Sequence, residues 1–340
     1  WPHEPVDFGG RRVAVIGTGS SGIQAIPVIA QQAEHVYVMQ RTPNFSIPAW
    51  NRPLPLDEQA VFKADYAAHR ARAKATRSGI LYEYSQRSAF SVAEEERQAE
   101  YERRWARGGA NFTHAFNDIF RDQAANDTAA EFVRGKIRSI VRNPELAEKL
   151  MPRDHAIGTK RICVDTDYYA TYNRPNVSLV DLREDPILCV EPTGVRTRER
   201  LYPVDSIVFA TGYDALTGAL CRIDLRGRDG ASLAECWAEG PQTYLGLMVA
   251  GFPNLFTITG PGSPSVLTNV IMAIEQHGGV GGRRRQVAER LAGGHNAPLR
   301  PGAVVNAPLL ARDERGVGVA DGRMVRRDRA HGSEREAGGK

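Results

Sequence analysis

Blocks of apolar and polar residues predict an α/β unit at the start of the chain. Residues 13–16 form an apolar run of the kind that fills a buried strand. A glycine-rich turn and an apolar pattern at helical spacing follow, and residues 36–39 form a second apolar run. We therefore expect strand, turn, helix and strand in this order within residues 1–50.

The turn itself reads Gly17-Thr18-Gly19-Ser20-Ser21-Gly22-Ile23-Gln24, with the spacing G-x-G-x-x-G. In dinucleotide-binding proteins the first glycine permits a tight turn, the second lets the backbone approach the pyrophosphate, and the third allows close packing of helix on strand. The pyrophosphate lies at the N-terminus of the helix, facing free N–H groups and the positive end of the helix dipole. The strand before the motif and the helix after it supply the context that such a site requires.

The end of the second strand indicates which nucleotide is bound. Proteins that bind NAD carry an Asp or Glu there for the ribose 2′-hydroxyl. This chain has Gln40-Arg41-Thr42 instead, and Glu34 lies at the wrong end of the strand. The guanidinium of Arg41 is a permanently charged fork that suits a 2′-phosphate. The sequence thus favours NADP(H).

From about residue 51 to 150 the pattern turns helical and polar, which predicts a helical insertion in the α/β unit. Asn143-Pro144 is typical of an N-cap followed by proline in the first helical turn. Gly108-Gly109 predicts the end of a helix over residues 94–107. Thr128-Ala129-Ala130-Glu131 has the spacing of a capping box and predicts that a helix starts there.

Strand patterns return after the insertion, at residues 177–181, 187–190, 194–197 and 206–210. Together with 1–50, residues 151–215 are expected to complete one nucleotide-binding domain. Two further apolar stretches lie at 245–251 and 252–256. We assign residues 216–277 to part of a second α/β domain.

The basic charge of the chain lies in its last 63 residues. Residues 278–340 hold 13 Lys and Arg against 7 Asp and Glu, whereas the other 277 residues hold 31 against 33. All 26 aromatic residues precede position 278. Because so little apolar surface can be buried, we expect residues 278–340 to be disordered or to arise from a shifted reading frame. Without aromatic residues for base stacking, we expect no binding of nucleic acid.

Cysteine spacing and hydropathy bear on the cellular location of the protein. The four cysteines, Cys163, Cys189, Cys221 and Cys236, are far apart, so neither a zinc site nor a disulfide framework is indicated, and no metal is expected. No run approaches the roughly 18 apolar residues of a membrane span, and no signal peptide is evident. These features favour the cytoplasm and no membrane partner.

Several short motifs together carry a family resemblance. Residues 1–277 resemble the Baeyer–Villiger monooxygenases, class B flavoenzymes that insert oxygen beside a ketone carbonyl, and among them the phenylacetone and cyclohexanone monooxygenase types. Trp1 matches the last residue of the family fingerprint F-x-G-x-x-x-H-x-x-x-W. The other matching segments are 15–24, 40–44, 158–161, 164–169, 210–213 and 260–269.

The resemblance implies FAD and NADP(H) as cofactors, and a ketone and O2 as substrates. Thr18 to Gln24 would bind the NADP pyrophosphate, and Arg41, Thr42 and Lys160 would hold its 2′-phosphate. Arg161 matches the active-site arginine beside the flavin. A fixed cation there would stabilise both the deprotonated C4a-peroxyflavin and the oxyanion that follows, without donating a proton. The backbone of Val270 would contact FAD, and Ser265, Val266 and Leu267 would line the substrate pocket.

Two departures from the family pattern bear on activity. The earlier part of the fingerprint and the turn that binds the ADP half of FAD have no counterpart here, since the chain has a single G-x-G-x-x-G. Beyond His277 the Gly- and Arg-rich sequence replaces the family pattern. We therefore expect an internal fragment that binds little FAD and is inactive alone.

Two other functions remain open at this point. One is a flavin monooxygenase that oxygenates nitrogen or sulfur, against which Arg161 and Trp1-Pro2 argue. The other is an NADP-binding fragment without catalysis. A disulfide reductase is disfavoured because the cysteines are not paired.

Overall fold

The computed structural model describes residues 3–263 and 268–291, with side chains up to Gly282. Trp1–Gly282 form one compact unit and Arg283–Lys340 a second. Most of the second unit lies outside the described residues. The further division of residues 1–277 into a nucleotide-binding domain, an insertion and part of an FAD domain stays a prediction.

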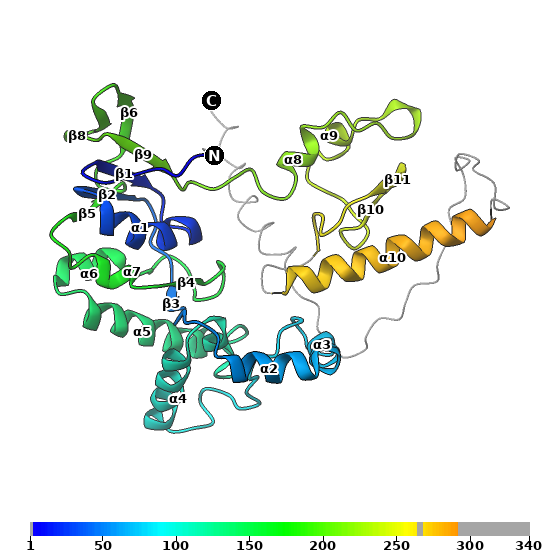
Figure 1. Ribbon diagram of the computed structural model, residues 1–340, viewed down its shortest axis with the longest axis horizontal. Coiled ribbons are helices and arrows are strands. Elements are labelled where there is room, and N and C mark those ends of the chain that lie inside the picture. The colour runs from blue at the N-terminus through cyan, green and yellow to red at the C-terminus, as the bar shows by residue number, and fades with distance from the viewer. Residues whose placement is uncertain (1–2, 264–267, 292–340) are drawn as a thin grey trace, which may run out of the picture. The chain divides into compact units, whose positions relative to one another are not determined.

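A four-stranded parallel sheet forms the centre of the nucleotide-binding part (Figure 1). Its strands are β1 (Arg12–Ile16), β2 (His35–Gln40), β5 (Val177–Asp181) and β9 (Ser206–Phe209), in the order β5-β2-β1-β9. Helix α1 (Ser20–Gln32) connects β1 to β2. The strand order reverses at β1, so the carboxyl ends of β1 and β9 border the crevice where ligands bind in such folds. This arrangement confirms the expected α/β fold.

Both faces of the sheet are buried, as the apolar strands require. On one face Val13, Val15 and Val38 pack with α1 and with aromatic residues of the helical insertion. On the other face Ala14 and Met39 pack against a small antiparallel sheet of β6 (Ile187–Glu191), β7 (Gly194–Thr197) and β8 (Leu201–Pro203). The insertion therefore shares a core with the parallel sheet.

The insertion leaves and rejoins the sheet domain at one place. Strand β3 (Ser46–Pro48) precedes it and pairs in parallel with β4 (Cys163–Asp165), which follows it. Between them lie α2 (Leu56–Ala64), α3 (Tyr66–Lys74), α4 (Glu94–Arg107), η1 (Ala110–His114), α5 (Gln123–Ile140) and α6 (Pro144–Leu150). Helix α7 (Tyr168–Thr171) comes directly after β4.

Two of the three predicted helix boundaries are confirmed. Helix α4 ends at Arg107, and Gly108 follows with φ +76°. The Asn143 side chain accepts a hydrogen bond from the Leu146 amide at the start of α6. The predicted capping box at Thr128 is wrong, because α5 begins at Gln123 and its N-cap is Asp122. The Thr128 hydroxyl donates instead to the Ala125 carbonyl within the helix.

The remaining described residues form short elements around a small core of their own. These are α8 (Gly218–Cys221), η2 (Arg228–Gly230), α9 (Leu233–Cys236), β10 (Met248–Val249) and β11 (Phe252–Phe256). Leu233, Trp237, Val249 and Phe252 pack together in that core.

Helix α10 (Val270–Leu291) follows. Its residues 278–291 belong to the stretch that we expect to be mostly disordered or frame-shifted. Arg, Gln, Ala and Glu from 283 onward favour helix there, whereas the glycines of 278–282 do not. The expectation for residues 292–340 lies outside the described residues. No helix in the described ranges is long and apolar enough to cross a membrane.

Candidate functional site: a dinucleotide turn and three unpaired cations

The glycine-rich turn has the geometry that its sequence predicts. Gly17 follows β1 with φ +108°, and a Cβ there would lie 2.5 Å from the Ala210 carbonyl oxygen. A Cβ on Gly22 would lie 2.2 Å from the Gly17 carbonyl oxygen. At Gly19, by contrast, a Cβ would meet nothing within 4 Å. The backbone at Gly19 is thus open to a ligand, and α1 carries no acidic residue in its first turn to repel an anion.

The difference in available space between Gly22 and Gly19 leads to a matched pair of predictions. We expect Gly22→Ala to lower the unfolding free energy by about 1–3 kcal/mol, because the added methyl overlaps the turn. We expect Gly19→Ala to keep the wild-type stability and to weaken NADPH binding at least tenfold, because its methyl occupies the ligand's approach. Thermal unfolding and calorimetry separate the two effects. Normal NADPH binding by Gly19→Ala would contradict the assignment of the turn.

Side chains of the turn connect it to two other predicted segments. The Thr18 hydroxyl donates to the Thr42 carbonyl at 3.0 Å, which joins the turn to the segment after β2. The Ser20 Oγ lies 3.3 Å from the Cys163 Sγ, and the Gln24 amide donates to the Val164 carbonyl at 2.9 Å. Cys163 and Val164 belong to β4, just after Lys160 and Arg161.

The structure thus brings together the three segments that the sequence assigns to NADP(H). Ser21 is exposed beside them, at the start of α1. Ile23 is different, because its side chain is fully buried in the core and its amide donates to the Gly19 carbonyl. Its side chain therefore contributes packing, and its assignment to the cofactor stays a prediction.

Arg41, Lys160 and Arg161 are exposed and form no ion pair with any residue in the described ranges. The cations around them differ in this respect. Lys149 pairs with Glu184, Arg153 with Glu148, and Arg183 with Asp154. The three cations that the sequence singles out are therefore available to an anionic ligand.

Buried titratable groups beside this site are structural. Burial raises the pKa of the Cys163 thiol, which therefore stays protonated and unreactive at neutral pH. Burial likewise raises the pKa of Asp165, whose carboxylate accepts hydrogen bonds from the Ser46 hydroxyl and the Tyr168 amide. These bonds hold β3 and α7 against β4, which is the strand that follows Arg161.

The residues assigned to FAD are only partly described. Val270 begins α10 and is 44% exposed. The backbone amide of the preceding Asn269 donates to the Ser78 carbonyl at 2.8 Å, and the Asn269 side chain accepts a hydrogen bond from the Ile271 backbone amide. Ser265, Val266 and Leu267 lie outside the described residues, so their predicted role in the substrate pocket stays a prediction.

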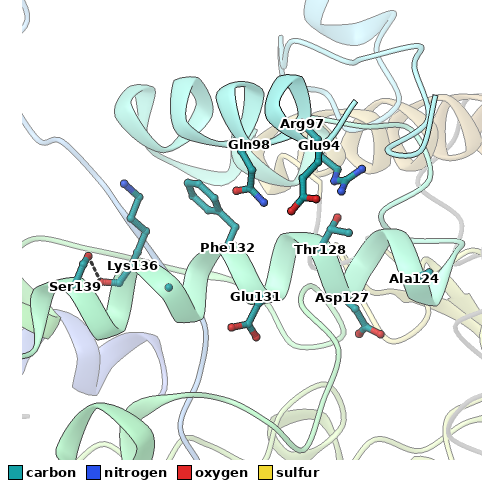
Figure 2. A pocket seen from close by; sticks show the side chains of 11 residues that line it. Glu94, Arg97, Gln98, Ala124, Asp127, Thr128, Glu131, Phe132, Lys136 and Ser139 are labelled. Carbon is teal, nitrogen blue, oxygen red and sulfur yellow. Dashed lines mark hydrogen bonds between the residues drawn. The ribbon is translucent and has the colours of Figure 1, made fainter. Parts of the chain in front are cut away.

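Two hollows in the described part of the chain differ in character. The larger, about 710 Å³, is an open groove between α4 and α5, lined by charged and polar side chains such as Glu94, Asp127 and Glu131 (Figure 2). It contains none of the predicted site residues. The smaller pocket, about 260 Å³, lies beside Arg41.

Sequence reasoning missed the other residues of this small pocket. They are Gln40, Pro43, Glu148, Lys149, Met151, Arg153, Asp181 and Arg183. Gln40 and Pro43 could have been found from their place beside Arg41. The others lie in or just after α6, or at or just after the end of β5, over 100 residues away, and nothing in the local pattern signals them.

Comparison with known proteins identifies the family. A Baeyer–Villiger monooxygenase of Pseudooceanicola batsensis is 41% identical over 278 residues, which cover 81% of this chain and 50% of the relative. The chain belongs to the Baeyer–Villiger monooxygenase family. It spans about half the length of the curated relatives that it matches. No protein-family model matches it.

Solved structures agree with this membership in the Baeyer–Villiger family. A structure titled oxidized steroid monooxygenase bound to NADP is 52% identical with a TM-score of 0.80, covering 85% of this chain and 56% of that chain. Another, titled OTEMO complex with FAD and NADP, is 42% identical with a TM-score of 0.81, covering 84% and 53%. The expected Baeyer–Villiger resemblance is therefore confirmed.

Proposed function

We propose that this chain carries the NADP(H)-binding part of an FAD- and NADPH-dependent Baeyer–Villiger monooxygenase. The whole enzyme would insert one oxygen atom of O2 beside a ketone carbonyl and form an ester or a lactone. The observation that carries the proposal is Arg41, an exposed cation without a carboxylate partner in the described ranges. It follows β2 directly, beside a turn whose Gly19 is open to a ligand.

The described residues fit NADP(H). The turn from Gly17 to Gln24 would receive the pyrophosphate at the N-terminus of α1. Arg41, Thr42 and Lys160 would hold the 2′-phosphate, and the Thr18–Thr42 hydrogen bond would keep the turn and the phosphate-binding segment in register. Both solved relatives described above contain NADP by their titles, which supports the same ligand here.

For FAD the fit is partial, because the described residues supply Arg161 and Val270 but no second glycine-rich turn. When bound, FAD and NADPH supply the redox chemistry, and the protein binds and orients them. The role of Arg161 would be electrostatic. A guanidinium keeps its proton in proteins, so Arg161 would stabilise negative charge that develops on oxygen and would not act as an acid. Its exposure and lack of a described ion pair leave it free to do so.

The first test is nucleotide binding by the purified 340-residue chain. We expect calorimetry to show NADPH binding, because the turn and its cations are complete. We expect the flavin absorbance spectrum to show little bound FAD, because the sequence has one glycine-rich turn. A folded chain that binds no NADPH would contradict the proposal, and stoichiometric FAD would show that the missing second turn is dispensable.

Turnover distinguishes the ketone reaction from its alternative. With added FAD, NADPH oxidation that depends on a ketone would support Baeyer–Villiger chemistry, whereas dependence on an amine or a sulfide would support nitrogen or sulfur oxygenation. Nucleotide binding without turnover would correspond to a non-catalytic fragment. We also propose a cytoplasmic location, which the four separate free thiols support.

A further inference from the structure

Strand β4 is attached to the glycine-rich turn through the start of α1. Ser20 and Gln24 are four residues apart on this helix, so their side chains lie on one face of it. They reach two successive residues of β4. The Ser20 Oγ lies 3.3 Å from the Cys163 Sγ, and the Gln24 Nε2 donates to the Val164 carbonyl at 2.9 Å. The helix that begins at the turn is thus bonded directly to this strand.

The Val164 carbonyl is directed away from β3, the strand with which β4 pairs. The next residue, Asp165, accepts a hydrogen bond through its carbonyl from the Ala49 amide, which directly follows β3. Successive residues of a strand direct their backbone groups to opposite sides. Val164 therefore cannot bond to β3 through its carbonyl, and Gln24 supplies the donor instead.

Lys160 and Arg161 lie on a short irregular span just before β4. At one end of the span Thr159 closes a turn through its amide and its hydroxyl, and at the other end β4 begins at Cys163. The amides of residues 160–162 donate to no backbone carbonyl within the described ranges. The place of the two cations therefore depends on where β4 is held.

We propose that Gln24 is a positioning residue for Lys160, the cation assigned to the 2′-phosphate of NADP(H). Its bond to β4 sets the distance between Lys160 and the turn assigned to the pyrophosphate, so that one ligand meets both at once. Gln24 thus contributes to affinity through Lys160 and not through contact with the nucleotide. This inference rests on the proposed NADP(H) binding and adds the residue that connects its two phosphate sites.

The test is Gln24→Met, which keeps the length of the side chain and removes the hydrogen-bond donor. We expect NADPH to bind about three- to tenfold more weakly, the effect of losing one neutral hydrogen bond. NADH binding should stay nearly unchanged, because NADH lacks the 2′-phosphate that Lys160 holds. Calorimetric titration of the purified chain measures both affinities. Thermal unfolding verifies that the variant is folded, which we expect because Gln24 is exposed.

A double-mutant cycle separates positioning from direct contact. In a Lys160→Ala chain, Gln24→Met should cause no further loss of NADPH affinity, because the residue that it positions has been removed. Gln31→Met is the matched control, since Gln31 is exposed near the other end of the same helix. It should bind both nucleotides as the wild type does.

Equal weakening of NADPH and NADH binding in Gln24→Met would show that Gln24 contacts a part common to both nucleotides, and it would overturn the inference alone. Unchanged NADPH binding in this variant would also overturn it, as would losses that simply add in the cycle with Lys160→Ala. A folded wild-type chain that binds neither nucleotide would overturn the proposed function as well.

Discussion

Replacing Arg41 by alanine is expected to weaken NADPH binding by about 10- to 100-fold and to leave NADH binding nearly unchanged. Charge-assisted hydrogen bonds to a phosphate contribute about 1.5–3 kcal/mol, and each 1.4 kcal/mol corresponds to about tenfold in affinity. Only NADPH carries the 2′-phosphate, so only NADPH loses this interaction. Since Arg41 forms no ion pair in the described ranges, its removal leaves no unpaired carboxylate there. Calorimetric titration with both nucleotides measures the effect.

The control for Arg41 is a partly exposed arginine that has an ion-pair partner. Arg196 lies on β7 and pairs with Glu191 of the small antiparallel sheet. Arg196→Ala removes the same charge from the chain and should bind NADPH as the wild type does. Raised salt should also narrow the difference between the wild type and Arg41→Ala, because the guanidinium is exposed. An equal loss of NADH and NADPH binding in Arg41→Ala would show that the arginine supports the fold and does not read the phosphate.

The pattern of neighbouring residues was enough to predict those elements that depend only on nearby residues. The strand before Gly17, the helix after it and the cap at Asn143 each depend on residues within one or two turns of chain. The error at Thr128 has the same origin, because a Thr-x-x-Glu spacing occurs inside helices as well as at their starts. What decided the boundary was the side chain of Asp122, which accepts the Ala125 amide at 2.8 Å.

Contacts between segments that are distant in the sequence could not be predicted from local pattern. The Thr18 hydroxyl and the Thr42 carbonyl are 24 residues apart, and the Gln40 side chain meets Lys149 across 109 residues. The first contact depends on the pairing of β1 with β2, and the second on how the insertion packs against the sheet, which no single stretch of sequence specifies. The sequence thus predicted Arg41 and the turn from residue type and spacing, whereas the pocket beside Arg41 could only come from the fold.

The largest effect on stability is expected from a buried arginine in the helical insertion. Arg104 on α4 is 1% exposed and donates to the Glu100 carboxylate, the Glu83 carbonyl and the Asn111 side chain at 2.7, 2.7 and 3.0 Å. These bonds hold the segment around Glu83 and the start of η1 against α4. Arg104→Met keeps a long apolar stem but leaves the acceptors without this donor. We expect a loss of about 3–5 kcal/mol in the free energy of unfolding, measured by urea denaturation.

Arg103 is a control that differs from Arg104 in burial and shares its carboxylate partners. It pairs with Glu83 and Glu100, but its side chain is 48% exposed. An exposed ion pair contributes about 0–1 kcal/mol, since water solvates the charges as well as the partner does. Arg103→Met should therefore cost no more than about 1 kcal/mol. If the two variants lost equal stability, burial of the guanidinium would not be the cause. If only Arg104→Met unfolds readily, the insertion depends on the buried guanidinium, because water cannot reach its hydrogen-bond acceptors. The insertion shares a core with the nucleotide-binding sheet, so the stability of the sheet depends on Arg104 too.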